Sequence, residues 1–200
     1  MPSLIVLHYT GMASCAEARA RLCDPTAEVS AHWLVSEAGE AEALVPEALR
    51  AWHAGAGAWG GLCDINSHSI GIELANPGDR PFPEPQMAAL EHLLAAVMAR
   101  WKIPARGVIA HSDMAPARKA DPGRRFDWRR LALKGLAVWP EVGPPGDFRA
   151  DLRGFGYPDA PQADLLVAFR LRFRPWGHGG LQVEDAALAA GLRDLAVQGA

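Results

Sequence analysis

Short apolar runs alternate with segments of helical periodicity in the first half of the chain, and this alternation restricts the fold. The apolar runs are 4–7, 30–36, 69–76 and 107–113. They are rich in Ile, Val and Leu or in aromatic residues, as strands are, and the first is typical of a strand buried on both faces. Helical spacing of apolar residues marks 15–24 and 83–101. Strands interleaved with helices predict an α/β fold, with a central mixed β-sheet flanked by helices.

The texture of the sequence changes at 139–148, a segment with three prolines and two glycines. Leucine and phenylalanine recur at helical spacing beyond it. The expected helices are 149–154, 163–173 and 184–198. A three-helix unit of this size is marginally stable alone, so we expect it to dock on the rest of the protein. The predicted domains are therefore a main domain over 1–140 and a small helical module over 147–200.

Composition excludes some classes of protein. Half of the 200 residues are hydrophobic, which is enough for a packed core. The formal net charge is −3, whereas phosphate binding needs a concentrated basic surface, so we predict no nucleic-acid partner. One basic cluster lies at 118–130, but Asp121 and Asp127 interrupt it.

Cysteine usage and the N-terminal segment bear on the cellular compartment. The three cysteines form no CxxC pair, and their odd number favours reduced thiols over a disulfide scaffold. The segment MPSLIVLHYTG lacks the basic and apolar regions of a signal peptide. No run approaches the roughly 20 apolar residues of a membrane helix. We therefore expect a cytoplasmic protein without a membrane segment; the alternative is a periplasmic protein whose signal was removed.

Polar side chains stand at the ends of predicted strands. His8 follows the first apolar run directly, and His111 lies in the last one. Glu73 lies on the face of its strand opposite the isoleucines, because successive side chains alternate between faces. A lone histidine at a strand end is more often a hydrogen-bonded core residue than a ligand. The function therefore depends on whether these side chains meet.

Two further polar residues that could take part in catalysis or metal binding follow in the segment RKADPG. Lys119 and Asp121 are two positions apart, so in an extended stretch they project to the same side. Two histidines and one carboxylate are a common set of three zinc ligands, which leaves a fourth position open for water. A second carboxylate can take the proton of that water, and a lysine can stabilise an oxyanion. Spacing alone leaves this site open, because ligands far apart in the chain have no local signature.

Four segments resemble, in this order, the motifs of the zinc-dependent N-acetylmuramoyl-L-alanine amidases of the type-2 family: LHYTG, WHAG, NSHSIGIELAN and AHSDMAPARKADPG. The resemblance covers residues 4–130 and is greatest to the anhydro-muropeptide amidase branch. It implies the amidase/peptidoglycan-recognition-like fold and a defined site, with His8, His111 and Asp121 as Zn²⁺ ligands, Glu73 as general base and Lys119 as the residue that steadies the tetrahedral intermediate. Other branches have a cysteine as third ligand, so Asp121 favours the recycling branch.

We also expect residues that contact substrate, two of them in the WHAG segment that lines the cleft in the family, one after the strand of Glu73 and one chosen for its positive charge. They are Trp52, His53, Asn76 and Arg118. In the WHAG segment, glycine lets the chain approach a ligand closely, and Trp52 offers an apolar wall to a sugar or peptide. Structural roles are the alternatives: Trp52 and His53 could pin a long loop to the core, and Arg118 could belong to a solvated rim. His32 is expected either as a core histidine bonded to backbone or as a residue behind the metal site.

The predicted helical module resembles the small peptidoglycan-binding module, chiefly through DLLVAFRLRFRP and EDAALAAGLRDL. The acidic and threonine positions of that module are only partly present in the last helix. Binding of cell wall and a purely structural role over the cleft both stay open for this module.

The resemblance implies that residues 1–140 form a zinc amidase domain. Its reaction would be hydrolysis of the amide bond between N-acetylmuramic acid, in its 1,6-anhydro form, and L-alanine of the stem peptide. A muropeptide is the expected partner, cell-wall recycling the expected role, and the protein is expected to be a monomer. One alternative is an exported hydrolase of intact wall, which the helical module would favour. Another is a non-catalytic peptidoglycan receptor, which should have lost a ligand or the base, whereas this chain keeps all five positions.

Overall fold

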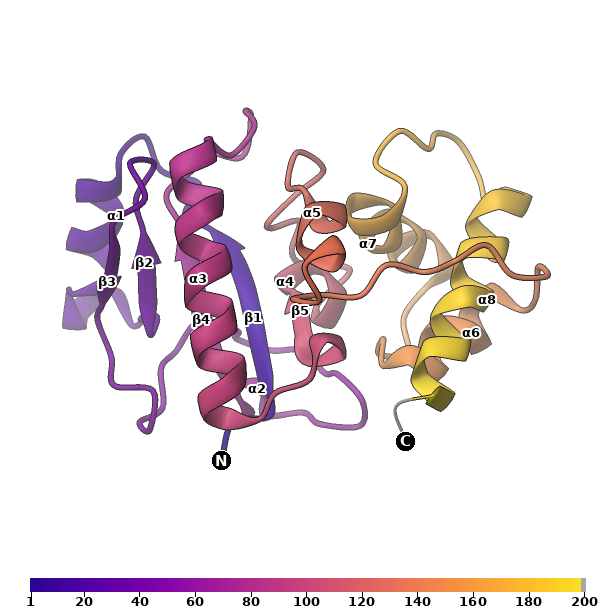
Figure 1. Cartoon of the computed structure of the whole chain (residues 1–200), viewed down its shortest axis with the longest axis horizontal. Coiled ribbons are helices and arrows are strands. Elements are labelled where there is room, and N and C mark those ends of the chain that lie inside the picture. Colours follow the sequence, from indigo (N-terminus) through magenta and orange to yellow (C-terminus); the bar gives the residue numbers. More distant parts are fainter. Residues whose placement is uncertain (199–200) are drawn as a thin grey trace.

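A computed structural model describes residues 1–198 as a five-stranded sheet with helices packed around it (Figure 1). The strands are β1 (Leu4–Tyr9), β2 (Trp33–Val35), β3 (Ala41–Ala43), β4 (Ser69–Leu74) and β5 (Val108–Ala110). Their order in the sheet is β3-β2-β4-β1-β5. β3 runs antiparallel to β2, and all other neighbours are parallel. The mixed sheet of an α/β fold that the sequence predicts is therefore confirmed.

Eight α-helices and two short 3₁₀ helices complete the described part of the chain. The α-helices are α1 (Cys15–Leu22), α2 (Ile65–His68), α3 (Glu84–Trp101), α4 (His111–Met114), α5 (Trp128–Leu133), α6 (Phe148–Phe155), α7 (Gln162–Phe173) and α8 (Val183–Gln198). The 3₁₀ helices are Pro25–Ala27 and Ala105–Gly107. In Figure 1, α3 lies in front of the sheet and runs along its strands, and α6, α7 and α8 gather beyond β5, at the opposite end from β3.

The alternation of side chains along the central strands separates a core from a functional face. Ile70, Ile72 and Leu74 of β4 are fully buried in the hydrophobic cluster that includes the buried side of α3. Glu73 therefore lies on the opposite face of the sheet. In the parallel register His8 of β1 is the direct partner of Glu73. Their side chains consequently emerge next to each other at the carboxyl ends of neighbouring strands.

The other face of the sheet shares its core with the C-terminal helices. Val6 of β1 and Ile109 of β5 belong to one cluster with Leu152 of α6, Phe169 of α7 and Leu192 of α8. The three helices lie where the helical spacing places them. The division at 1–140 and 147–200 stays a prediction, and the last two residues of the predicted module lie outside the described residues.

Local differences from the expected elements have identifiable causes. The segment expected as a strand over 107–113 leaves the sheet after Ala110, because the carboxylate of Asp113 accepts a hydrogen bond from the Ala110 amide and starts α4 there. The sequence does not predict β3, because its sequence AEA has no apolar pattern; it pairs with β2 at one end of the sheet. α5 was not expected either; its N-terminus is capped by the Asp127 side chain.

Candidate functional site

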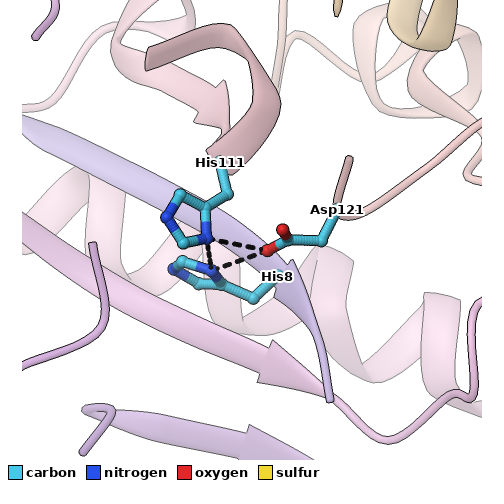
Figure 2. Close-up of side chains that lie close together, drawn as sticks. All are labelled: His8, His111 and Asp121. Carbon is cyan, nitrogen blue, oxygen red and sulfur yellow. Dashed lines mark hydrogen bonds and ion pairs between the residues drawn. The ribbon is translucent and has the colours of Figure 1, made fainter. Parts of the chain in front are cut away.

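Three donor atoms converge at the carboxyl edge of the sheet (Figure 2). Nδ1 of His8 lies 2.8 Å from Nδ1 of His111, and both nitrogens lie 2.9 Å from Oδ2 of Asp121. The side chains come from β1, from the first residue of α4 and from the loop that follows α4, and all three are buried. The structure thus brings together the three residues predicted as zinc ligands.

The hydrogen-bond partner of Nε2, on the side of the His111 ring away from Asp121, shows that this nitrogen carries a proton. Nε2 of His111 lies 2.8 Å from the carbonyl oxygen of Ala54. A carbonyl can only accept, so Nε2 carries a proton, and Nδ1 is the nitrogen that faces Asp121.

A chain of hydrogen bonds places a proton on Nε2 of His8 as well. The hydroxyl of Ser69 donates to the carbonyl of Ile65 at 2.6 Å, so its oxygen accepts from Nε2 of His53 at 3.3 Å. Nδ1 of His53 then accepts from Nε2 of His8 at 3.1 Å. His8 is left with an unprotonated Nδ1 that faces the centre of the cluster.

The charge states are consistent with a cation site. Burial, with the neighbouring His111 as the second cause, lowers the pKa of His8 to about 4. Burial opposes the ionisation of Asp121, but the adjacent imidazoles of His111 and His8 outweigh it and hold the pKa of this carboxyl well below the usual range. Two imidazole nitrogens and a carboxylate oxygen therefore share one small volume, an arrangement that a bound cation would stabilise. This donor set fits Zn²⁺, with the fourth position open.

Glu73 stands beside this cluster with an unused oxygen. Its Oε2 is buried and has no hydrogen-bond partner within the described part of the chain. Burial raises the pKa of Glu73 to about 8; the charge of Asp121 also raises it, and the charge of Lys119 opposes both. A carboxyl group with a pKa near neutrality can both take and return a proton, as a general base requires.

A cavity of about 510 Å³ opens in front of the cluster, a size suited to a small ligand. Its lining includes His8, His111, Asp121, Glu73, Lys119, Trp52, His53 and Arg118. All five residues predicted to bind metal or to act in catalysis therefore face one cavity, together with three of the four predicted substrate contacts.

The predicted substrate contacts differ in what their side chains do. Trp52 is 57% exposed at the rim, with the guanidinium of Arg50 stacked 4.4 Å from its ring centroid. Arg118 faces the cavity and also donates to the carbonyls of Ala54, at 2.7 Å, and Ala56. Asn76 lies outside the cavity lining and is buried, where its side chain accepts from the Gly78 amide. Its contact with substrate stays a prediction.

His53 has a position that its predicted role did not include. It lines the cavity but is bonded to His8 on one side and to Ser69 on the other. Gly71 of β4 makes room for it, since a Cβ at Gly71 would lie 2.3 Å from the His53 ring. The sequence signal for this contact is the glycine of the SIGIE motif, because a glycine inside a strand often marks a place where another group approaches the backbone closely.

Two more residues support the segment that carries His53. The side-chain oxygen of Asn66 accepts from the backbone amides of His53 and Ala54, at 3.0 and 2.9 Å. His32 accepts from the Gly71 amide at 2.9 Å and donates to the Leu49 carbonyl at 3.0 Å. The prediction of His32 as a core histidine bonded to backbone is confirmed.

Comparisons with known proteins identify relatives along the chain. The family model for N-acetylmuramoyl-L-alanine amidase matches residues 1–124. N-acetylmuramoyl-L-alanine amidase AmiD of Escherichia coli (strain K12) is 34% identical over 227 residues, which is 94% of this chain and 81% of AmiD. 1,6-Anhydro-N-acetylmuramyl-L-alanine amidase AmpD of Haemophilus influenzae is 39% identical over 103 residues, about half of each chain (51% and 56%).

A solved structure is similar over almost the whole molecule. It is the complex of AmiD from E. coli with its substrate anhydro-N-acetylmuramic acid-L-Ala-D-γ-Glu-L-Lys. The TM-score is 0.89 at 33% identity, and the match covers 97% of this chain and 89% of the AmiD chain. The similarity therefore extends beyond the sheet to the C-terminal helices.

Proposed function

Because the chain belongs to the N-acetylmuramoyl-L-alanine amidase family, we propose that it cleaves the bond between N-acetylmuramic acid and L-alanine in 1,6-anhydro-muropeptides, as a step of cell-wall recycling. Support for the anhydro form comes from the substrate held by AmiD, whose fold matches nearly all of this chain. AmpD, named for the same anhydro sugar, is the second relative in favour.

Zn²⁺ is the metal that the proposal assigns to His8, His111 and Asp121, because two imidazole nitrogens and one carboxylate oxygen with an open fourth position suit it. When bound, the ion would supply a Lewis acid that activates water and polarises the substrate carbonyl. All proton transfers fall to side chains of the chain.

Glu73 and Lys119 have the two other catalytic roles, proton transfer and stabilisation of negative charge. Glu73 takes the proton from the attacking water and returns it to the nitrogen of L-alanine as the bond to the lactyl carbonyl breaks. Its partnerless Oε2 and its raised pKa support this role. The ammonium group of Lys119, which faces the same cavity, stabilises the negative charge that develops on the carbonyl oxygen.

The rim of the cavity accounts for substrate binding in the proposal. Trp52 offers an exposed aromatic face to the sugar or the peptide. Arg118 holds the loop at 54–56 and presents positive charge to the carboxylates of the stem peptide.

The observation that carries the proposal is the meeting of three metal-ligand atoms, in one cavity, beside a buried carboxyl oxygen of Glu73 that has no hydrogen-bond partner among the described residues. The test supplies anhydro-muramyl-tripeptide and intact sacculi to the purified protein, with and without a chelator, and identifies products by mass spectrometry. We expect free peptide from the small fragment, lost on chelation and restored by Zn²⁺. The Glu73→Gln variant is the control for release that does not depend on the site.

The same experiment separates the alternatives. Comparable release from sacculi would favour an exported wall hydrolase, an alternative that the C-terminal helices support. Binding without release would favour a non-catalytic receptor. None of the helices within residues 1–198 has the length and apolar character that crossing a bilayer requires. The proposal includes a cytoplasmic location, which a preference of the enzyme for anhydro-muramyl-tripeptide over sacculi would support. A preference for sacculi would favour the periplasm instead.

A further inference from the structure

Arg172, in the second of the three C-terminal helices, reaches the segment that carries His111. Arg172 of α7 is 2% exposed, and its guanidinium forms an ion pair with the carboxylate of Asp113 in α4. The same guanidinium donates to the carbonyl of Val108, at the start of β5, at 3.2 Å. It also lies over the ring of the buried Trp128, 4.1 Å from the ring centroid, within the range of a cation–π interaction.

Asp113 is the second half of this connection. It is fully buried, and its Oδ2 accepts from the Ala110 amide at 2.9 Å, which sets the first turn of α4. Its Oδ1 accepts from the hydroxyl of Tyr157, between α6 and α7, at 2.6 Å. Burial raises the pKa of Tyr157 well above its usual value, so the hydroxyl stays a donor. Asp113 is therefore held by two side chains from beyond residue 147.

His111 lies between the two points at which Arg172 holds the chain. Val108 precedes it by three residues and Asp113 follows it by two. A shift of the His111 backbone would strain a buried charge pair, and breaking such a pair leaves an uncompensated charge. Nδ1 of His111 lies 2.8 Å from Nδ1 of His8 and 2.9 Å from Oδ2 of Asp121, so the donor cluster depends on where the His111 backbone lies.

We propose that the C-terminal helices position His111 for metal binding, with Arg172 and Tyr157 acting through Asp113. The inference rests on the proposed metal site and adds positioning residues to it. It assigns the predicted helical module a role in the catalytic centre that does not require contact with cell wall.

Arg170 provides a matched control. It is a second buried arginine of α7, 8% exposed, and it pairs with Asp185 of α8 at 2.6 Å. Its other partners are the carbonyls of Gly179 and Gly180. Arg170→Met therefore removes a buried ion pair from the same helix without touching β5 or α4.

The test compares Arg172→Met with Arg170→Met in the full chain by two measurements. Zn²⁺ affinity is measured by competition with a chromophoric chelator, and hydrogen exchange of the 108–115 segment is measured in metal-free protein. We expect Arg172→Met to weaken Zn²⁺ binding about ten-fold, in the range found for residues that orient metal ligands, and to speed exchange of 108–115. Arg170→Met should leave both unchanged.

Unchanged affinity and exchange in Arg172→Met, or equal losses in both variants, would overturn the inference. Tyr157→Phe is the milder second variant, for use if Arg172→Met does not fold. It keeps the ring and removes one hydrogen bond to Asp113, so a smaller loss of Zn²⁺ affinity is expected and no loss would contradict the inference. Wild-type protein that binds no Zn²⁺ would refute the proposed function, while the exchange measurement would still decide the positioning role.

Discussion

Nε2 of His8 lies 3.1 Å from Nδ1 of His53, and this contact determines which nitrogen of His8 faces Asp121. The Ser69 hydroxyl decides which atoms in this chain of hydrogen bonds carry a proton. It donates its one proton to the Ile65 carbonyl, so it can bond to His53 only by accepting a proton from that ring. Residues behind the ligands thus prepare the lone pair that a metal ion would use.

His53→Ala should weaken Zn²⁺ binding about ten-fold, because His8 loses the acceptor that orients its ring. Chelator competition measures the change, with Trp52→Ala as the control that alters the same cavity without touching a ligand. If His53 acts instead as a substrate contact, its removal should raise KM while Zn²⁺ affinity stays at the wild-type value.

Gly71→Ala should produce a related defect from the other side of the ring. The added Cβ would lie 2.3 Å from His53, so the ring has to move, and overpacking of this kind costs typically about 1–3 kcal/mol. Unfolding by denaturant and Zn²⁺ titration together detect it. Gly154→Ala in α6, where a Cβ would meet nothing within 4 Å, should be neutral or stabilising by up to about 1 kcal/mol. Equal behaviour of the two variants would argue against a packed position for His53.

Glu73→Gln should keep Zn²⁺ binding and lose turnover by about 10²–10⁴-fold, the usual contribution of a general base. The substitution preserves shape and removes the ability to take a proton. Product release from anhydro-muramyl-tripeptide and the Zn²⁺ content of the same preparation are the two measurements. Turnover near the wild-type rate would exclude Glu73 as the base.

The raised pKa of Glu73 also predicts a pH dependence of stability in metal-free protein. The folded pKa of about 8 exceeds the ordinary value of 4.5, so the contribution of Glu73 is fully present below pH 4.5 and is lost as pH rises towards 8. The loss cannot exceed about 1.4 kcal/mol per pH unit. His8, with its pKa lowered to about 4, has the opposite effect between pH 6.5 and 4. Comparing wild type with Glu73→Gln isolates the carboxyl group; parallel profiles of unfolding free energy from pH 5 to 8.5 would contradict the prediction.

Trp52→Ala should raise KM for the muropeptide with little change in kcat, since the ring lies at the rim and no metal ligand depends on it. Its effect on folding stability should stay within about 0.5 kcal/mol, as for other exposed side chains. Steady-state kinetics measures both constants. A fall in kcat at constant KM would contradict the prediction and would mean that Trp52 takes part in the chemical step.

The sequence predicted what depends on local pattern. The apolar run before His8 and the alternation around Glu73 identify strands and faces, and parallel pairing of those strands then puts both side chains at one edge. Recognition of the family motifs assigned Asp121 to the same cluster, which spacing alone could not do. Contacts between distant segments carried no pattern: the fit of His53 over Gly71 and the pairing of Arg172 with Asp113 depend on how separate elements pack.

X-ray diffraction at the zinc absorption edge, on crystals of the Zn²⁺-loaded protein, tests the central claim most directly. The account predicts one anomalous peak bounded by Nδ1 of His8, Nδ1 of His111 and Oδ2 of Asp121, with ligand distances of about 2.0–2.2 Å. A peak elsewhere in the molecule, or ligation of either histidine through Nε2, would contradict it.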